Sequence, residues 1–136
     1  MSRYRTDLGF TLTELMITVA VLSILIGIAV PNYRQYVIRG NRSAAQSVMM
    51  DIANREQQFL LANRRYADKA TLESNGFALP SDVREKYTWD VTLGAGSRPS
   101  FVITFTGIGA QATDNSPQPL TLSSSGEKAP ADKWRR

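Results

Sequence analysis

The sequence predicts an α+β protein in which one long N-terminal α-helix packs against a small antiparallel β-sheet. An apolar run fills residues 10–30, a helical repeat of apolar positions follows as far as Tyr66, and alternating strand patterns appear only after Lys86. These three observations place a helix first and a sheet second. With 136 residues, the chain is long enough for one compact domain with an additional segment attached.

The apolar run from Phe10 to Val30 contains a single charged residue, Glu14. About 20 such residues span the core of a bilayer as a helix. A secretory signal peptide has a shorter apolar stretch, about 7–15 residues, and a small-residue cleavage site after it. Here the run is longer and Pro31 follows it. We therefore predict a membrane helix, with a kink at Pro31 because proline removes a backbone donor.

Beyond Pro31 the chain continues with the period of an amphipathic helix. Its apolar residues recur at spacings of three, four or seven, at Val37, Ala44, Ala45, Val48, Ile52, Phe59 and Tyr66. Together the two segments predict one helix from about Phe10 to Asn63, roughly 80 Å long at 1.5 Å per residue. A small domain cannot bury that length, so part of the helix must lie in lipid or against other subunits.

Two strands are predicted at 87–93 and 101–105, because apolar and polar residues alternate there. One face of the pair carries Tyr87, Trp89, Val91, Leu93, Phe101, Ile103 and Phe105. This face could be an exposed stacking platform, but alternation favours a sheet face packed on the helix. A weaker third strand begins at Leu120, a helical turn is expected at 71–74, and residues 123–136 are interpreted as loop.

The net charge of +4 comes from one segment, in which six arginines between Tyr33 and Tyr66 face only Asp51 and Glu56. A basic helix can contact the phosphates of nucleic acid. The rest of the chain is neutral overall and offers no extended basic surface. We therefore favour arginines that face solvent, lipid headgroups or other subunits. The basic residues near the C-terminus are expected to form a solvated tail; they are Lys128, Lys133, Arg135 and Arg136.

The sequence contains no histidine and no cysteine. Histidine-dependent catalytic triads, histidine or thiolate metal sites and disulfides are therefore excluded. The carboxylates lack the spacing of a calcium loop, and no phosphate loop or dinucleotide fingerprint is present. We expect no enzymatic activity, no cofactor and no metal site.

The segment Gly9–Met16, which reads GFTLTELM, resembles the processing signature of type IV prepilins. The resemblance implies cleavage after Gly9, methylation of the new N-terminal Phe10, and a role for Glu14 in assembly. Thr13 stands where isoleucine is common in that family. A carboxylate within a membrane span is costly unless it is paired, and the amine created at Phe10 could neutralise Glu14 of the same or a neighbouring subunit. The alternative is an ordinary single-pass anchor with a stray glutamate.

The resemblance is strong over residues 9–66, where Pro31 also matches a proline of the family, and weaker beyond. The C-terminal part is similar to minor pilins of the PilE type. The segments that carry this similarity are 109–114, 120–123, 126–128 and the closing Trp134. Many of those pilins end in Cys-Trp and carry a disulfide-bonded loop, whereas here Lys133 precedes Trp134. The C-terminal loop must therefore be held by packing and hydrogen bonds.

The resemblance implies a leader at 1–9, a transmembrane and filament-core helix at 10–31, and a globular head at 32–136 that includes the amphipathic half of the helix. It implies a structural subunit of a type IV pilus, a minor pilin, for motility, adhesion or DNA uptake. The subunit would wait in the inner membrane with its head in the periplasm, and would then join a helical filament.

The partners that the resemblance implies are other pilin subunits, a prepilin peptidase and methyltransferase, an inner-membrane assembly platform, and membrane lipid before assembly. The alternatives are a pseudopilin of a type II secretion system and a competence pilin that binds DNA. Nucleic acid is the less favoured partner.

Overall fold

A computed structural model describes residues 9–115 and 118–135. The chain divides into two compact units, Met1–Val37 and Ile38–Arg136, and each is described by itself. The leader predicted at 1–9 lies outside the described residues except for Gly9.

The long helix α1 spans Leu12–Asn63, which confirms the single helix predicted from the two apolar patterns. It begins two residues later than expected and contains Pro31 without a break, so the kink there remains a prediction. The helix stops where Arg64 adopts a left-handed backbone conformation, with φ 57°, while its N–H donates to the Leu60 carbonyl. A left-handed residue of this kind is a common end for a helix.

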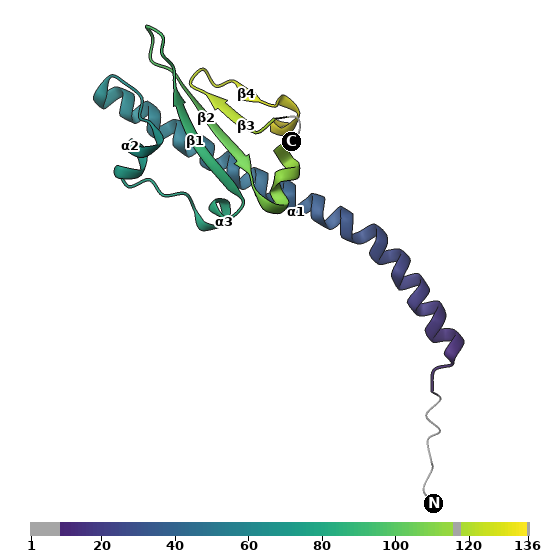
Figure 1. Cartoon of the computed structure of the whole chain (residues 1–136). Helices are drawn as coiled ribbons and strands as arrows, with labels where there is room; N and C mark the ends of the chain where they lie inside the picture. Colours follow the sequence, from purple (N-terminus) through teal and green to yellow (C-terminus); the bar gives the residue numbers. More distant parts are fainter. Residues whose placement is uncertain (1–8, 116–117, 136) are drawn as a thin grey trace, which may run out of the picture. The chain divides into compact units, whose positions relative to one another are not determined.

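The second unit contains a four-stranded antiparallel sheet of order β1-β2-β3-β4 (Figure 1). The strands are β1 (Tyr87–Leu93), β2 (Phe101–Gly107), β3 (Leu120–Ser123) and β4 (Lys128–Ala129). The first three confirm the predicted strands. β4 lies in a segment that was interpreted as loop, and its two residues are too few to give an alternating pattern.

Short helices fill the connections. They are α2 (Lys69–Ser74) and α3 (Ser81–Arg84) before the sheet, the 3-10 helix η1 (Gly109–Asn115) between β2 and β3, and the 3-10 helix η2 (Ala131–Trp134) after β4. The helical turn expected at 71–74 is thus part of α2. The other three helices were not predicted.

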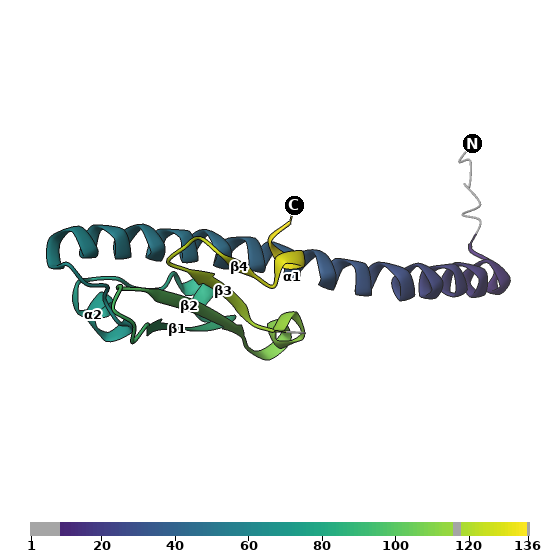
Figure 2. The ribbon, with the colours of Figure 1, turned by 90° about the horizontal axis from the view of Figure 1, so that it is seen from above.

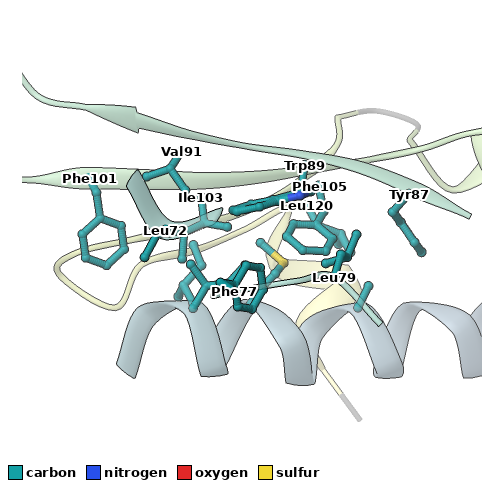
Figure 3. Packing of buried hydrophobic residues seen from close by; sticks show 14 of the residues in the cluster. Leu72, Phe77, Leu79, Tyr87, Trp89, Val91, Phe101, Ile103, Phe105 and Leu120 are labelled. Carbon is teal, nitrogen blue, oxygen red and sulfur yellow. The ribbon is translucent and has the colours of Figure 1, made fainter. Parts of the chain in front are cut away.

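The core lies between one face of the sheet and the second half of α1 (Figures 2 and 3). Burial alternates along β1 and β2, so that Trp89, Ile103 and Phe105 point inward together. From α1 they meet a stripe that includes Met49 and Ile52, both fully buried. The predicted packing of sheet on helix is confirmed, and the alternative of an exposed aromatic platform is wrong for this face.

The segment between α1 and β1 contacts the rest of the head at two places. The Glu56 carboxylate, fully buried on α1, accepts a hydrogen bond of 2.8 Å from the Ala67 N–H. Burial raises the pKa of the Glu56 carboxyl, and the Ala67 hydrogen bond opposes that shift. Further along, the Phe77 ring packs edge-on against Trp89 with centroids 5.1 Å apart. α2 and α3, which belong to the same segment, lie beside the β1 edge of the sheet (Figure 1).

Candidate assembly segment and basic groove

The apolar part of α1 is exposed in this chain. The large apolar side chains between Leu12 and Val30 are 44% to 77% exposed. In the part of the chain that the structure describes, α1 is the one helix long and apolar enough to cross a membrane, with a mean hydropathy of 2.3 in its most apolar window. So much exposed apolar surface is unstable in water, and it requires lipid or protein around it.

The start of α1 is capped by three reciprocal hydrogen bonds between Thr11 and Glu14. The Glu14 carboxylate accepts from the Thr11 backbone N–H at 2.9 Å and from the Thr11 hydroxyl at 2.8 Å. In return, the Glu14 N–H donates to the Thr11 hydroxyl oxygen at 3.2 Å. This is a capping box, which satisfies backbone donors at a helix start that have no partner inside the helix.

The bond between Gly9 and Phe10 lies just before α1, in exposed chain without regular secondary structure. Phe10 is 87% exposed, and apart from its two chain neighbours nothing lies within 4 Å of a Cβ placed at Gly9. A peptidase requires its substrate backbone outside a helix and free of neighbours. The predicted cleavage position therefore has the accessibility that processing demands.

The head contains a buried polar group around Asp114, called here the Asp114 cluster, made of Arg42, Tyr87, Gln111, Asp114 and Lys133. The two oxygens of Asp114 lie 3.6 Å from Arg42 Nε and 3.8 Å from Lys133 Nζ. Tyr87 donates its hydroxyl to Asp114 at 3.3 Å, and Gln111 donates its side-chain amide to the Tyr87 oxygen at 2.7 Å. Burial and the nearby carboxylate raise the pKa of Tyr87, so its hydroxyl remains a donor.

The Asp114 cluster joins α1, β1, η1 and η2, and so holds the C-terminal segment. Gln46 on α1 also donates to the Lys133 carbonyl at 2.9 Å, and the Trp134 indole donates to the Ala129 carbonyl at 3.2 Å. Packing, hydrogen bonds and ion pairs thus hold the C-terminal segment in place without a disulfide. The expected solvated tail is wrong for Lys133, which is 8% exposed, because Asp114 draws its ammonium inward.

A groove of about 690 Å³ runs between residues 39–50 of α1 and residues 132–135 in and after η2. We call it the α1–η2 groove. Its charged lining residues are Arg39, Arg42, Lys133, Arg135 and Asp132. Arg42 and Lys133 are engaged with Asp114, whereas Arg39 and Arg135 are exposed and form no ion pair with any residue that the structure describes. The groove is therefore a polar depression with a positive rim.

Comparison with known families matches two descriptions in succession along the chain. Residues 4–30 match the prokaryotic N-terminal methylation motif, and residues 31–121 match the family described as type IV minor pilin ComP, DNA uptake sequence receptor. The chain belongs to the type IV pilin family. The pilin fold, a long apolar helix packed on a four-stranded antiparallel sheet, agrees with this assignment.

Among curated relatives, the pilin is 33% identical to the type IV major pilin protein PilA of Myxococcus xanthus over 88 residues. It is 34% identical to the type IV major pilin protein PilE1 of Neisseria gonorrhoeae over 89 residues. Each match covers 65% of the pilin, but 38% of PilA and 53% of PilE1. The pilin thus spans about half or less of these relatives, and both major and minor pilins resemble it.

The pilin brings three of its predicted site residues together. Gly9, Phe10 and Glu14 lie within the first turn of α1 or just before it, while Pro31 lies further along the helix. The cap made by Thr11 was missed, although threonine followed three residues later by glutamate before an apolar run is a known signal for it. The Asp114 cluster was also missed, because no local pattern links residues 42, 114 and 133.

Proposed function

We propose that this pilin is a minor structural subunit of a type IV pilus. It is inserted in the inner membrane by the first half of α1, with its head in the periplasm, and then assembles into a helical filament. Cleavage after Gly9 and methylation of Phe10 by a prepilin peptidase and methyltransferase prepare it for assembly, which an inner-membrane platform carries out. The observation that carries the proposal is the exposed apolar surface of α1 between Leu12 and Val30.

That surface is suited to two apolar environments, one before assembly and one after it. In the membrane it contacts lipid chains, and in a filament it contacts the same helix of neighbouring subunits. The exchange costs little hydrophobic energy because both environments are apolar, so packing and polar contacts decide it. The Glu14 carboxylate lies at the start of this surface, one helical turn from the amine that cleavage would create at Phe10.

Processing is the first test of the proposal. Mass spectrometry of the protein isolated from membranes is expected to show a chain that begins with N-methylated Phe10. The exposed, non-helical backbone at Gly9 makes this bond accessible. A Gly9→Val variant, with a branched side chain at the cut position, is expected to retain its leader. An intact leader in the wild-type protein, or cleavage after the apolar run, would show that the chain is not processed as a pilin.

A second candidate function is DNA binding in uptake, and the family match over residues 31–121 favours it. The head presents exposed cations that have no ion-pair partner among the residues that the structure describes. These cations are Arg39, Arg64, Arg65, Arg84, Arg98, Lys128 and Arg135. Exposed arginine and lysine side chains supply the phosphate contacts that dominate affinity for nucleic acid.

Retention of labelled duplex DNA by the full chain in a neutral detergent tests this candidate. Binding is expected to weaken steeply with salt, with a slope of about −0.9 in log–log form for each phosphate contacted. Duplexes of several sequences, measured at one salt concentration, separate sequence preference from general attraction. Absence of retention at low salt, or retention that salt does not change, would exclude a DNA-receptor role.

A further inference from the structure

The residues just after Pro31 differ in chemistry from the apolar run before them. Residues 32–36 read NYRQY, and every side chain among them carries a hydrogen-bond donor. All five side chains are exposed, Tyr33 at 69% and Tyr36 at 77%. None of them forms a side-chain hydrogen bond or an ion pair with any residue that the structure describes. This part of α1, called here the 32–36 segment, therefore presents polar groups that are available to an outside partner.

The length of the apolar run determines the depth of the 32–36 segment when that run crosses a bilayer. Residues 10–30 are roughly 30 Å long at 1.5 Å per residue, which matches the thickness of the hydrocarbon core. Tyr33 and Tyr36 then follow the edge of the core by about 4.5 and 9 Å along α1. The headgroup layer on each side of the core is about 5–8 Å thick. Because helical side chains tilt toward the N-terminus of their helix, both rings reach back into that layer.

The side chains of the 32–36 segment suit this layer chemically. Tyrosine is enriched at membrane surfaces because its ring is apolar and its hydroxyl is polar. Tyr33 and Tyr36 are three residues apart, so they are neighbours on one side of α1. Arg34 lies between them in sequence, and its planar guanidinium matches the geometry of a phosphate group. Its long apolar stem allows the charge to remain among headgroups.

We propose that the 32–36 segment is a binding site for phospholipid headgroups. Tyr33 and Tyr36 anchor α1 at the depth of the headgroups, and Arg34 binds the phosphate of an anionic phospholipid. The inference rests on the proposed membrane-inserted state of the pilin. Lipid fits better than a second copy of this chain, because helices that pack together in membranes prefer small residues at their contact. The 32–36 segment contains no small residue.

Spin labelling tests the depth, because the chain has no cysteine of its own. A label at Gln35→Cys reports on the segment, one at Leu22→Cys on the apolar run, and one at Ser97→Cys on an exposed loop of the head. The full chain is placed in phosphatidylcholine vesicles, and the accessibility of each label to oxygen and to a water-soluble nickel complex is measured by electron paramagnetic resonance. The Gln35 label is expected to give a value between those of the other two.

The same measurement tests the tyrosine anchors. Tyr33→Ala with Tyr36→Ala is expected to shift the Gln35 label toward the value of the Ser97 label, because the segment loses its attachment to the headgroup layer. Tyr33→Trp with Tyr36→Trp is the matched control. It is expected to keep the wild-type depth, since tryptophan is enriched at the same depth as tyrosine.

Lipid preference tests the role of Arg34. The preference of the full chain for phosphatidylglycerol over phosphatidylcholine is measured with spin-labelled lipids in mixed vesicles. Arg34→Gln is expected to lower this preference by up to about fivefold, the effect of one cation at an anionic membrane surface. Arg34→Lys is expected to keep most of it because the charge remains. Arg98→Gln removes an exposed cation from the loop between β1 and β2, and is expected to change nothing.

The outcomes separate this inference from the proposed function. A Gln35 label that matches the Leu22 or the Ser97 label, or an unchanged lipid preference in Arg34→Gln, would overturn the headgroup site and leave the chain a membrane-inserted pilin. If the tyrosine and arginine variants keep wild-type depth and lipid preference but no longer enter filaments, the segment contacts other subunits and the inference is wrong. If the Leu22 label is itself open to water, the chain does not insert and the proposed function fails.

Discussion

Glu14→Ala is expected to leave the protein in the membrane and to lower its amount in filaments by about tenfold or more. Insertion survives because the change makes the span more apolar. Cleavage largely survives because Gly9 and Phe10 are unchanged. Assembly fails because the Phe10 amine of a neighbour would then enter apolar surroundings without a counter-charge. Leaving one member of a buried ion pair alone costs about 3–5 kcal/mol.

The Thr11–Glu14 cap gives Glu14 a second role, in capping α1. The Glu14→Gln variant separates this role from charge pairing. Glutamine can keep the reciprocal hydrogen bonds of a capping box, but it carries no charge. If the charge matters for assembly, Glu14→Gln is expected to fail nearly as severely as Glu14→Ala. If capping is the whole role, Glu14→Gln is expected to assemble and Thr11→Ala to reproduce the defect.

The measurement is the ratio of this chain in sheared filaments to that in membranes, determined by quantitative immunoblotting. Helix content in detergent micelles, measured by circular dichroism, controls for loss of the cap. Wild-type ratios for both Glu14 variants would rule out charge pairing as the mechanism that brings this subunit into filaments.

Asp114→Ala is expected to lower the free energy of unfolding of the head by about 3–5 kcal/mol, because it leaves the buried Lys133 and the partly buried Arg42 without a counter-charge. It also removes the acceptor for the Tyr87 hydroxyl. Asp51→Ala is the matched control. Asp51 pairs with Arg55 one turn further along α1, but both side chains are about half exposed, so about 0.5 kcal/mol or less is expected.

Urea unfolding of the full chain in a neutral detergent, followed by the fluorescence of its tryptophans, measures both variants. A double variant, Asp114→Asn with Lys133→Met, is expected to recover part of the loss because it removes both buried charges together. Limited proteolysis is expected to cut Asp114→Ala first within the C-terminal segment. Equal stability of Asp114→Ala and Asp51→Ala would show that the Asp114 cluster contributes no more than a surface pair.

The elements that the sequence predicted correctly are those with a long, regular period. The apolar run at residues 10–30 and the amphipathic stripe beyond it defined α1, and seven alternating residues defined β1. These patterns are local, and hydrophobic periodicity reports them directly. The start of α1 depended on a hydrogen-bonded cap, which is a feature of four residues, and it was placed two residues too early.

The Asp114 cluster could not be predicted because its members are scattered along the chain and none has an unusual local context. Lys133 resembled part of a basic tail, and Asp114 resembled one of several isolated carboxylates. Their pairing depends on η1 and η2, which are short 3-10 helices without a sequence period. Buried Glu56 was missed for the same reason, since it occupies the apolar stripe of α1. One of its oxygens accepts from a backbone amide eleven residues later, and the other has no hydrogen-bond partner among the described residues.

The way in which the C-terminal segment is fastened has a consequence for maturation in the cell envelope. Because its attachment uses ions, amides and aromatic packing, the head acquires its final structure without any oxidation step. Because the 136 residues include no cysteine, no thiol oxidase has to act on them and no intermediate with a wrongly paired disulfide can form. In the proposed pilus subunit, no disulfide has to form before assembly, whatever the redox state of its surroundings.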